Sequence, residues 1–165
     1  MKLTKRFLTL ALALVLVFSV FTLVACADKP TVQEVTDLTL PTLADNQVAV
    51  IIKNGDKDYT NYVAPINDGM EDVEDVLNYL AEELDLYLDW QDSTFGKYLN
   101  GIGGAIPKQT NQYVFFYTSV AADKSNEAGA PGYTIGDVEI VSAQVGVSSA
   151  KVESGAVYYF EIGTY

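Results

Sequence analysis

The clearest pattern of apolar and polar positions lies in "VEDVLNYLAEEL", residues 73–84. Apolar residues recur there at steps of three and four, which is the period of an amphipathic helix with one buried face. They are Val73, Val76, Leu77, Leu80, Ala81 and Leu84. Acidic residues gather at and before the start of this stripe, where the helix dipole favours negative charge. The pattern predicts one helix, with Asp68 as its N-cap.

Short runs rich in β-branched and aromatic residues predict strands on both sides of this helix. Residues 47–53 and 59–66 enclose Asn54-Gly55, a dipeptide typical of tight hairpin turns in which both central residues have positive φ. Pro65 has no N–H to donate, so we expect it at a sheet edge or near the end of its strand. After the helix, the predicted strands are 86–90, 97–102, 112–120, 137–145 and 156–162.

Alternation within the two aromatic strands divides their side chains between opposite faces of a sheet. One face of the first strand holds Tyr113, Phe115 and Tyr117, and the other holds Val114 and Phe116. In the last strand, Tyr158, Phe160 and Ile162 oppose Val157, Tyr159 and Glu161. If one face packs on the helix, the other displays tyrosines, which are typical of recognition surfaces. The alternative is that these rings only pair across strands and stabilise the sheet.

One hairpin, one crossing helix and further strands without a second helix predict an α+β fold. We expect a β-grasp-like mixed sheet that carries its helix on one face, formed by residues 47–165. Residues 26–46 contain Pro30 and Pro41 and show no sustained period, so they are expected to form a flexible, semi-extended linker. The polar stretch 121–132 is expected to be an exposed loop.

Residues 1–25 have the pattern of an export signal, because three basic residues precede an apolar core from Phe7 to Ala25. The tetrapeptide "LVAC", ending at Cys26, resembles the lipobox of bacterial lipoproteins, in which the cysteine thiol receives a diacylglyceryl group. The alternative is a transmembrane anchor, since the apolar run is long enough to cross a bilayer. We expect a lipoprotein anchored through Cys26 on the extracytoplasmic face of the cell membrane.

Charge and composition exclude several classes of function. The chain has 22 acidic and 10 basic residues, and three of the basic residues precede Cys26, so cleavage there leaves a net charge of −15. Such a chain repels the phosphates of nucleic acid, and its acidity favours a soluble monomer. It contains no histidine, and Cys26 is its only cysteine, which excludes His-dependent catalysis, His-ligated zinc and disulfides. We therefore expect no enzyme activity and no cofactor.

Two other motifs are weaker than they first appear. In "FGKYLNGIGG", Gly96 and Gly101 have the spacing of a phosphate-binding loop, but Ile102 and Gly103 stand where such a loop needs Lys and then Ser or Thr. This stretch is expected to contain a bend. The acidic clusters at 54–58 and 67–75 are rich in oxygen ligands but do not fit the register of an EF-hand, so no metal site is assigned.

Four segments together resemble the DUF4430 domain, a family described as similar to the carboxy-terminal domain of transcobalamin. They are the helix "VEDVLNYLAEEL", "FGKYLNGIGG", "QYVFFYTS" and "GVSSAKVESGAVYYFEI". The positions that match the family motifs are Gly96, Tyr98, Leu99, Ile102, Gly104, Tyr113, Phe115, Phe116, Tyr117, Gly146, Val152 and Gly155. The resemblance implies a β-grasp-like fold on an exported Gram-positive lipoprotein, with an inserted segment near 121–145.

These observations favour a membrane-anchored extracellular lipoprotein that carries a non-catalytic ligand-binding module. The resemblance implies a corrinoid-like small molecule as one ligand; the alternative is a structural or adhesive surface domain that binds a protein or a glycan. The expected contacts are the aromatic strand faces and the loop 121–136. The candidate ligand-binding residues are Trp90, Tyr98, Tyr113, Tyr117 and Tyr159. A small-molecule binder should have a concave pocket lined by Tyr and Trp, and an adhesive domain should have a flat or loop-built face.

Overall fold

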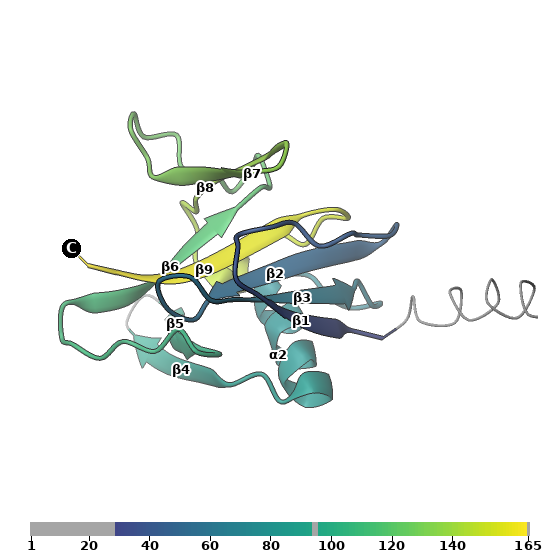
Figure 1. The fold of residues 1–165 in the computed structure, drawn as a ribbon, viewed down its shortest axis with the longest axis horizontal. Coiled ribbons are helices and arrows are strands. Elements are labelled where there is room, and N and C mark those ends of the chain that lie inside the picture. Colours follow the sequence, from purple (N-terminus) through teal and green to yellow (C-terminus); the bar gives the residue numbers. More distant parts are fainter. Residues whose placement is uncertain (1–28, 94–95, 165) are drawn as a thin grey trace, which may run out of the picture.

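The computed structural model describes residues 29–93 and 96–164, and its largest feature is a seven-stranded sheet of order β1-β3-β2-β9-β6-β8-β7 (Figure 1). Its strands are β1 (Thr31–Val35), β2 (Gln47–Lys53), β3 (Tyr59–Pro65), β6 (Gln112–Thr118), β7 (Gly132–Ile135), β8 (Val138–Ser142) and β9 (Val157–Thr164). The β2–β9 pair is parallel and the other pairs are antiparallel. β4 (Leu88–Ser93) and β5 (Gly96–Ile102) form a separate two-stranded ribbon.

The predicted α+β, β-grasp-like class is wrong, because the structure is dominated by its sheet, with 45% of it in strands and 11% helical. The helix α2 (Val73–Leu84) does lie against one face of the sheet, together with the β4–β5 ribbon. On the other side of the sheet, the β7–β8 hairpin contributes Ile135 and Ile140 to a second hydrophobic cluster (Figure 1). The physical reason is that segments expected to be a linker and a loop add β1 and β7, so the sheet grows beyond the area that one helix covers.

Helix α2 has the bounds that its apolar stripe predicts, but its N-cap is Asp72 and not Asp68. The Asp72 carboxylate accepts a hydrogen bond from the N–H of Asp75 at 3.1 Å, and the Asp75 carboxylate accepts one from the N–H of Asp72 at 3.3 Å. This reciprocal capping box satisfies two backbone donors at the helix start. The acidic cluster before the helix therefore has a structural role.

Strand β2 lies in the centre of the molecule and is buried on both faces, which explains its nearly continuous apolar run. Val48, Val50 and Ile52 face α2 in the first hydrophobic cluster, whereas Ala49 and Ile51 face the second cluster. The predicted alternation of β6 and β9 is confirmed. The first cluster contains Tyr158 and Phe160, with Val114, Phe116 and Ile162 packed against it, and the second contains Tyr117, Val157 and Tyr159, with Phe115 packed against it.

Part of the expected linker is packed on the sheet. β1 pairs antiparallel with β3, as Thr31↔Val63 through Val35↔Tyr59. The chain then crosses to the face opposite α2, where Leu38, Leu40 and Leu43 pack against the second hydrophobic cluster. These residues lack a regular period because they follow the shape of a surface that forms only when the sheet folds.

No helix among the described residues is long and apolar enough to span a membrane. The predicted signal segment 1–25 and Cys26 lie outside the described residues.

The β2–β3 hairpin is confirmed and β3 ends at Pro65, but the turn differs from the predicted one. Residues 54–58 form a longer loop closed by the Asn54 N–H and the Asp58 carbonyl at 2.8 Å, and neither Asn54 nor Gly55 has positive φ. The Asn54 side chain instead donates to Thr60 Oγ1 at 2.6 Å and accepts from the Gly104 N–H at 3.1 Å. The glycine-rich stretch is thus fastened to this hairpin.

Replacement of Gly104 by alanine is expected to lower the free energy of unfolding by about 1–3 kcal/mol, as overpacking does. A Cβ at this position would lie 2.6 Å from Asn54 Oδ1 and 2.9 Å from Asn54 Cβ, so the side chain that holds the two segments together must move. Urea unfolding of Gly104→Ala measures the loss. Gly55→Ala is the control, because nothing lies within 4 Å of a Cβ there. Equal losses in the two variants would show that the Asn54 contact is unimportant.

Candidate functional site

The five aromatic residues predicted to bind a ligand do not gather in one place. Tyr117 and Tyr159 are buried in the second hydrophobic cluster, whereas Tyr113 is 46% exposed. Trp90 and Tyr98 belong to the β4–β5 ribbon, in which Tyr98 lies opposite Gln91 and donates its hydroxyl to that side chain. A shared pocket formed by all five residues is therefore not present in the described structure.

Trp90 lies on the inner side of the ribbon and packs against the first cluster. Lys97 Nζ stands 5.6 Å from the centre of its ring and also forms an ion pair with Glu74 of α2 at 2.7 Å. The indole N–H is buried and has no hydrogen-bond partner among the described residues. These contacts indicate that Trp90 joins the ribbon to the helix and the sheet.

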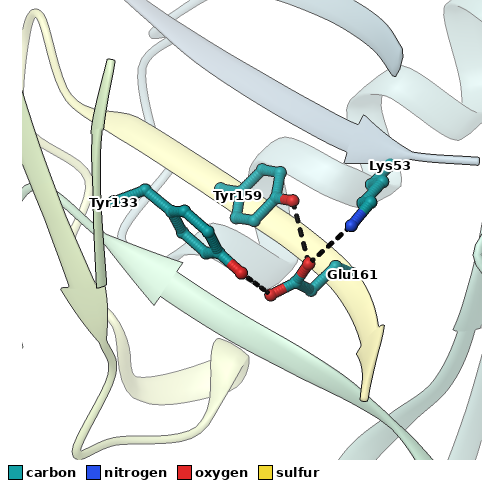
Figure 2. Close-up of polar contacts among 4 residues, drawn as sticks. All are labelled: Lys53, Tyr133, Tyr159 and Glu161. Carbon is teal, nitrogen blue, oxygen red and sulfur yellow. Dashed lines mark hydrogen bonds and ion pairs between the residues drawn. The ribbon is translucent and has the colours of Figure 1, made fainter. Parts of the chain in front are cut away.

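On the face of the sheet opposite α2, the Glu161 side chain of β9 has three polar partners (Figure 2). Its Oε1 accepts the Tyr133 hydroxyl at 2.5 Å, and its Oε2 accepts the Tyr159 hydroxyl at 3.0 Å and lies 3.4 Å from Lys53 Nζ. The rings of Tyr117, Tyr133 and Tyr159 pack edge to face or tilted, with centroids 5.3–5.5 Å apart. We call these five residues the Glu161 cluster.

The Glu161 cluster holds its tyrosines as neutral hydrogen-bond donors. Burial, together with the bond to the Glu161 carboxylate, raises the pKa of Tyr133 to about 12. Burial and the nearby carboxylate also raise the pKa values of Tyr117 and Tyr159. A phenol with a raised pKa is a poor base or nucleophile near neutral pH, and the carboxylate is already bonded to three partners. This arrangement suits a structural clamp better than a catalytic group.

Tyr133 was missed in the sequence, because the segment around it was interpreted as an exposed loop. It lies on β7, whose pairing with β8 joins Ile135 to Val138 across the two residues Gly136 and Asp137. Gly136 has φ +64, and Gly-Asp between two alternating runs is a hairpin signal that was available in the sequence. Tyr133 connects the β7–β8 hairpin to β9 through Glu161.

A groove of about 480 Å³ runs along the outer side of β6. One wall is formed by β6 itself, and the other by the loop after it and the end of β8. The lining residues are Tyr113, Val114, Phe115, Phe116, Ser125, Glu127, Pro131, Ser142, Ala143 and Gln144. Apolar strand residues therefore face a loop that carries one carboxylate, and Tyr113 is the most exposed of the aromatic residues in the groove.

Two other hollows lie elsewhere on the described structure. One, of about 640 Å³, is lined by Glu34, Val35, Thr36, Asp37, Thr39, Asn54, Asp58 and Tyr59. The second, of about 310 Å³, lies between the 54–56 turn and the segment 104–108. Within residues 29–93 and 96–164, no group of three or more Asp, Glu, His or Cys side chains is arranged to hold a metal ion.

No family model and no curated protein matches the chain. The resemblance to the DUF4430 domain therefore rests on the motifs quoted above, and the function must be argued from the geometry of the groove and of the Glu161 cluster.

Proposed function

We propose that this chain is a membrane-anchored, extracytoplasmic lipoprotein whose folded part is a non-catalytic module that binds a macromolecular partner at the groove beside β6. The observation that carries the proposal is the contrast between the tyrosines. Tyr133 and Tyr159 of the Glu161 cluster donate their hydroxyls to one carboxylate, whereas Tyr113 presents an exposed ring beside a groove that combines apolar strand residues with a polar loop. Exposed aromatic side chains around an apolar strip are typical of recognition surfaces.

The shape of the groove favours a protein or glycan partner over a corrinoid-like molecule. A flat macrocycle needs a concave pocket with large aromatic walls, but none of the three hollows described above is lined by both Tyr and Trp. The groove is built from a strand and a loop, which is the arrangement expected of a surface that meets another macromolecule.

Cross-linking in intact cells tests the binding function. A photoreactive phenylalanine analogue placed at position 113 is expected to give one defined adduct, because this ring borders the groove. The same analogue at position 87 is the control, since Tyr87 is about as exposed but lies beside Gly101 of β5 and does not line the groove. Absence of an adduct at 113, or the same adducts at both positions, would contradict the proposed function.

Anchoring is tested separately through Cys26. Cys26→Ser is expected to abolish incorporation of a labelled fatty acid and to move the protein out of the membrane fraction, because the thiol is the predicted site of lipid attachment. Ser19→Ala, within the same signal segment, is the control and should still be labelled. Undiminished labelling of Cys26→Ser would refute the anchor.

A further inference from the structure

Within residues 29–93 and 96–164, one side of β6 is only partly covered. β9 pairs with β6 along its whole length, from Gln112↔Thr164 to Thr118↔Tyr158. On the other side, β8 pairs only with Tyr117 and Thr118. The chain makes one more bond to β6, from the Ala143 N–H to the Phe116 carbonyl at 2.9 Å, and then turns away, since the Gln144 N–H donates to the Asp123 carbonyl. The line of β8 therefore stops beside Phe116, while β6 continues.

The register shows which backbone groups point into this gap. The Ser119 N–H donates to the Val157 carbonyl of β9 at 3.0 Å, so β6 residues an even number of positions from Ser119 direct their backbone groups to β9. Val114 has the opposite parity, like Phe116, whose carbonyl bonds to Ala143. The N–H and carbonyl of Val114 thus face away from β9, toward the groove. We call this side of β6 the Val114 edge.

The Val114 edge lacks the features that protect other sheet edges. Natural edge strands are shortened or carry charges, prolines or bulges, which prevent pairing with another chain. β1 carries Glu34 and follows Pro30, and β7 spans only Gly132–Ile135. By contrast, no charged residue occurs between Lys108 and Asp123, and β6 itself is "QYVFFYT". An uncharged aromatic strand with outward backbone donors and acceptors is suited to binding another strand.

We propose that the Val114 edge binds an extended peptide segment of a partner protein by strand addition, in line with the end of β8. The proposal rests on the proposed function and names the class of partner. Backbone hydrogen bonds to Val114 supply affinity, and successive side chains of the peptide point to opposite faces, where they pack against Phe115 on one side and Phe116 on the other. Of the described residues that line the groove, Glu127 is the charged one, so it selects a peptide with a basic residue beside the strand.

A second copy of this chain fits the Val114 edge poorly. The gap extends only from Gln112 to Val114, because β8 and Ala143 occupy the positions beside Phe116, Tyr117 and Thr118. The β6 strand of a second copy would bring its own β8 and Ala143 into this short gap, so few residues would pair. The predicted net charge of −15 on the cleaved chain also repels a copy of itself. A narrow peptide with a basic residue satisfies both limits.

The test uses the whole mature protein and small peptides of alternating Val and Thr that end in Arg. Isotope-labelled protein is titrated up to about 1 mM peptide, the weak end of specific binding. The expected result is saturable shifts of the amide signals of residues 112–116 and of the 124–131 loop. A control peptide of the same sequence with methylated backbone nitrogens should bind at least about tenfold more weakly, because it has no N–H groups to donate to β6. Equal binding of the control peptide, or no binding, would overturn the proposal.

Charge reversal provides a second readout that does not depend on strand pairing. Glu127→Lys is expected to weaken the Arg-ended peptide by about tenfold and to favour the same peptide ended in Glu, since opposite charges select the partner. Glu82→Lys, an exposed residue on α2, is the matched control and should change neither affinity. Identical effects of the two reversals would also count against the proposal. If a defined adduct forms at position 113 but these peptides fail, the proposed function stands and strand addition does not.

Discussion

Replacement of Glu161 by alanine is expected to lower the free energy of unfolding by about 2–3 kcal/mol, because it removes the shared acceptor of two tyrosine hydroxyls and a lysine. Tyr159 is 1% exposed, so its hydroxyl would lose its partner where water does not easily replace it. Lys53 and Tyr133 are more exposed and can be rehydrated, which keeps the loss below that of breaking a fully buried ion pair.

Urea unfolding of Glu161→Ala measures this loss, and hydrogen exchange should show faster opening of the β7–β8 hairpin, since Tyr133 joins that hairpin to β9. Glu139→Ala is the matched control. Glu139 also pairs with a lysine, at 3.3 Å from Lys124 Nζ, but its side chain is 72% exposed, so the loss should be below about 1 kcal/mol. If both variants unfold at the same urea concentration, the Glu161 cluster is not a clamp.

Phe160→Ala is expected to cost about 3–5 kcal/mol, the range for truncating a buried aromatic residue, because both transfer energy and cavity formation contribute. Phe160 lies on β9 beneath α2, is completely buried and stacks on Phe116 with ring centroids 5.0 Å apart. Thermal and urea unfolding of the variant report the change.

The control for Phe160→Ala is Tyr87→Ala, which removes an aromatic ring that is 50% exposed and should cost no more than about 1 kcal/mol. A small loss at Phe160 would mean that the first cluster rearranges to fill the space. Such a result would contradict a single close-packed core on the helix side of the sheet.

Local patterns predict the elements whose residues have one clear face. The stripe from Val73 to Leu84 defines α2 without reference to the rest of the chain, and alternation assigns Phe116 and Phe160 to the opposite face from Tyr117 and Tyr159. These assignments hold because side-chain direction follows from the period of the backbone, 3.6 residues in a helix and two in a strand.

Elements that depend on distant partners were missed. β1 has no apolar face of its own, and it is a strand because β3 offers an edge to pair with. β7 is short and mostly exposed, and its register comes from β8. Likewise, the Asn54-Gly55 turn takes a conformation other than the predicted one, because the Asn54 side chain bonds to Thr60 and Gly104. For β1 and the Asn54-Gly55 turn, a contact with a distant segment outweighs the local preference, whereas the β7–β8 hairpin has a local signal in Gly136-Asp137.

The sequence alone determines the export and lipobox pattern, the acidity of the chain, the absence of histidine, the helix and the alternating faces of the aromatic strands. Each of these properties follows either from neighbouring residues in the chain or from a sum over all of its residues. The tertiary structure decides that Tyr117 and Tyr159 are buried around Glu161, that Tyr133 joins them, and that β8 leaves part of β6 uncovered at Val114. Burial and strand pairing depend on which segments meet in space, and that depends on the order of strands in the sheet.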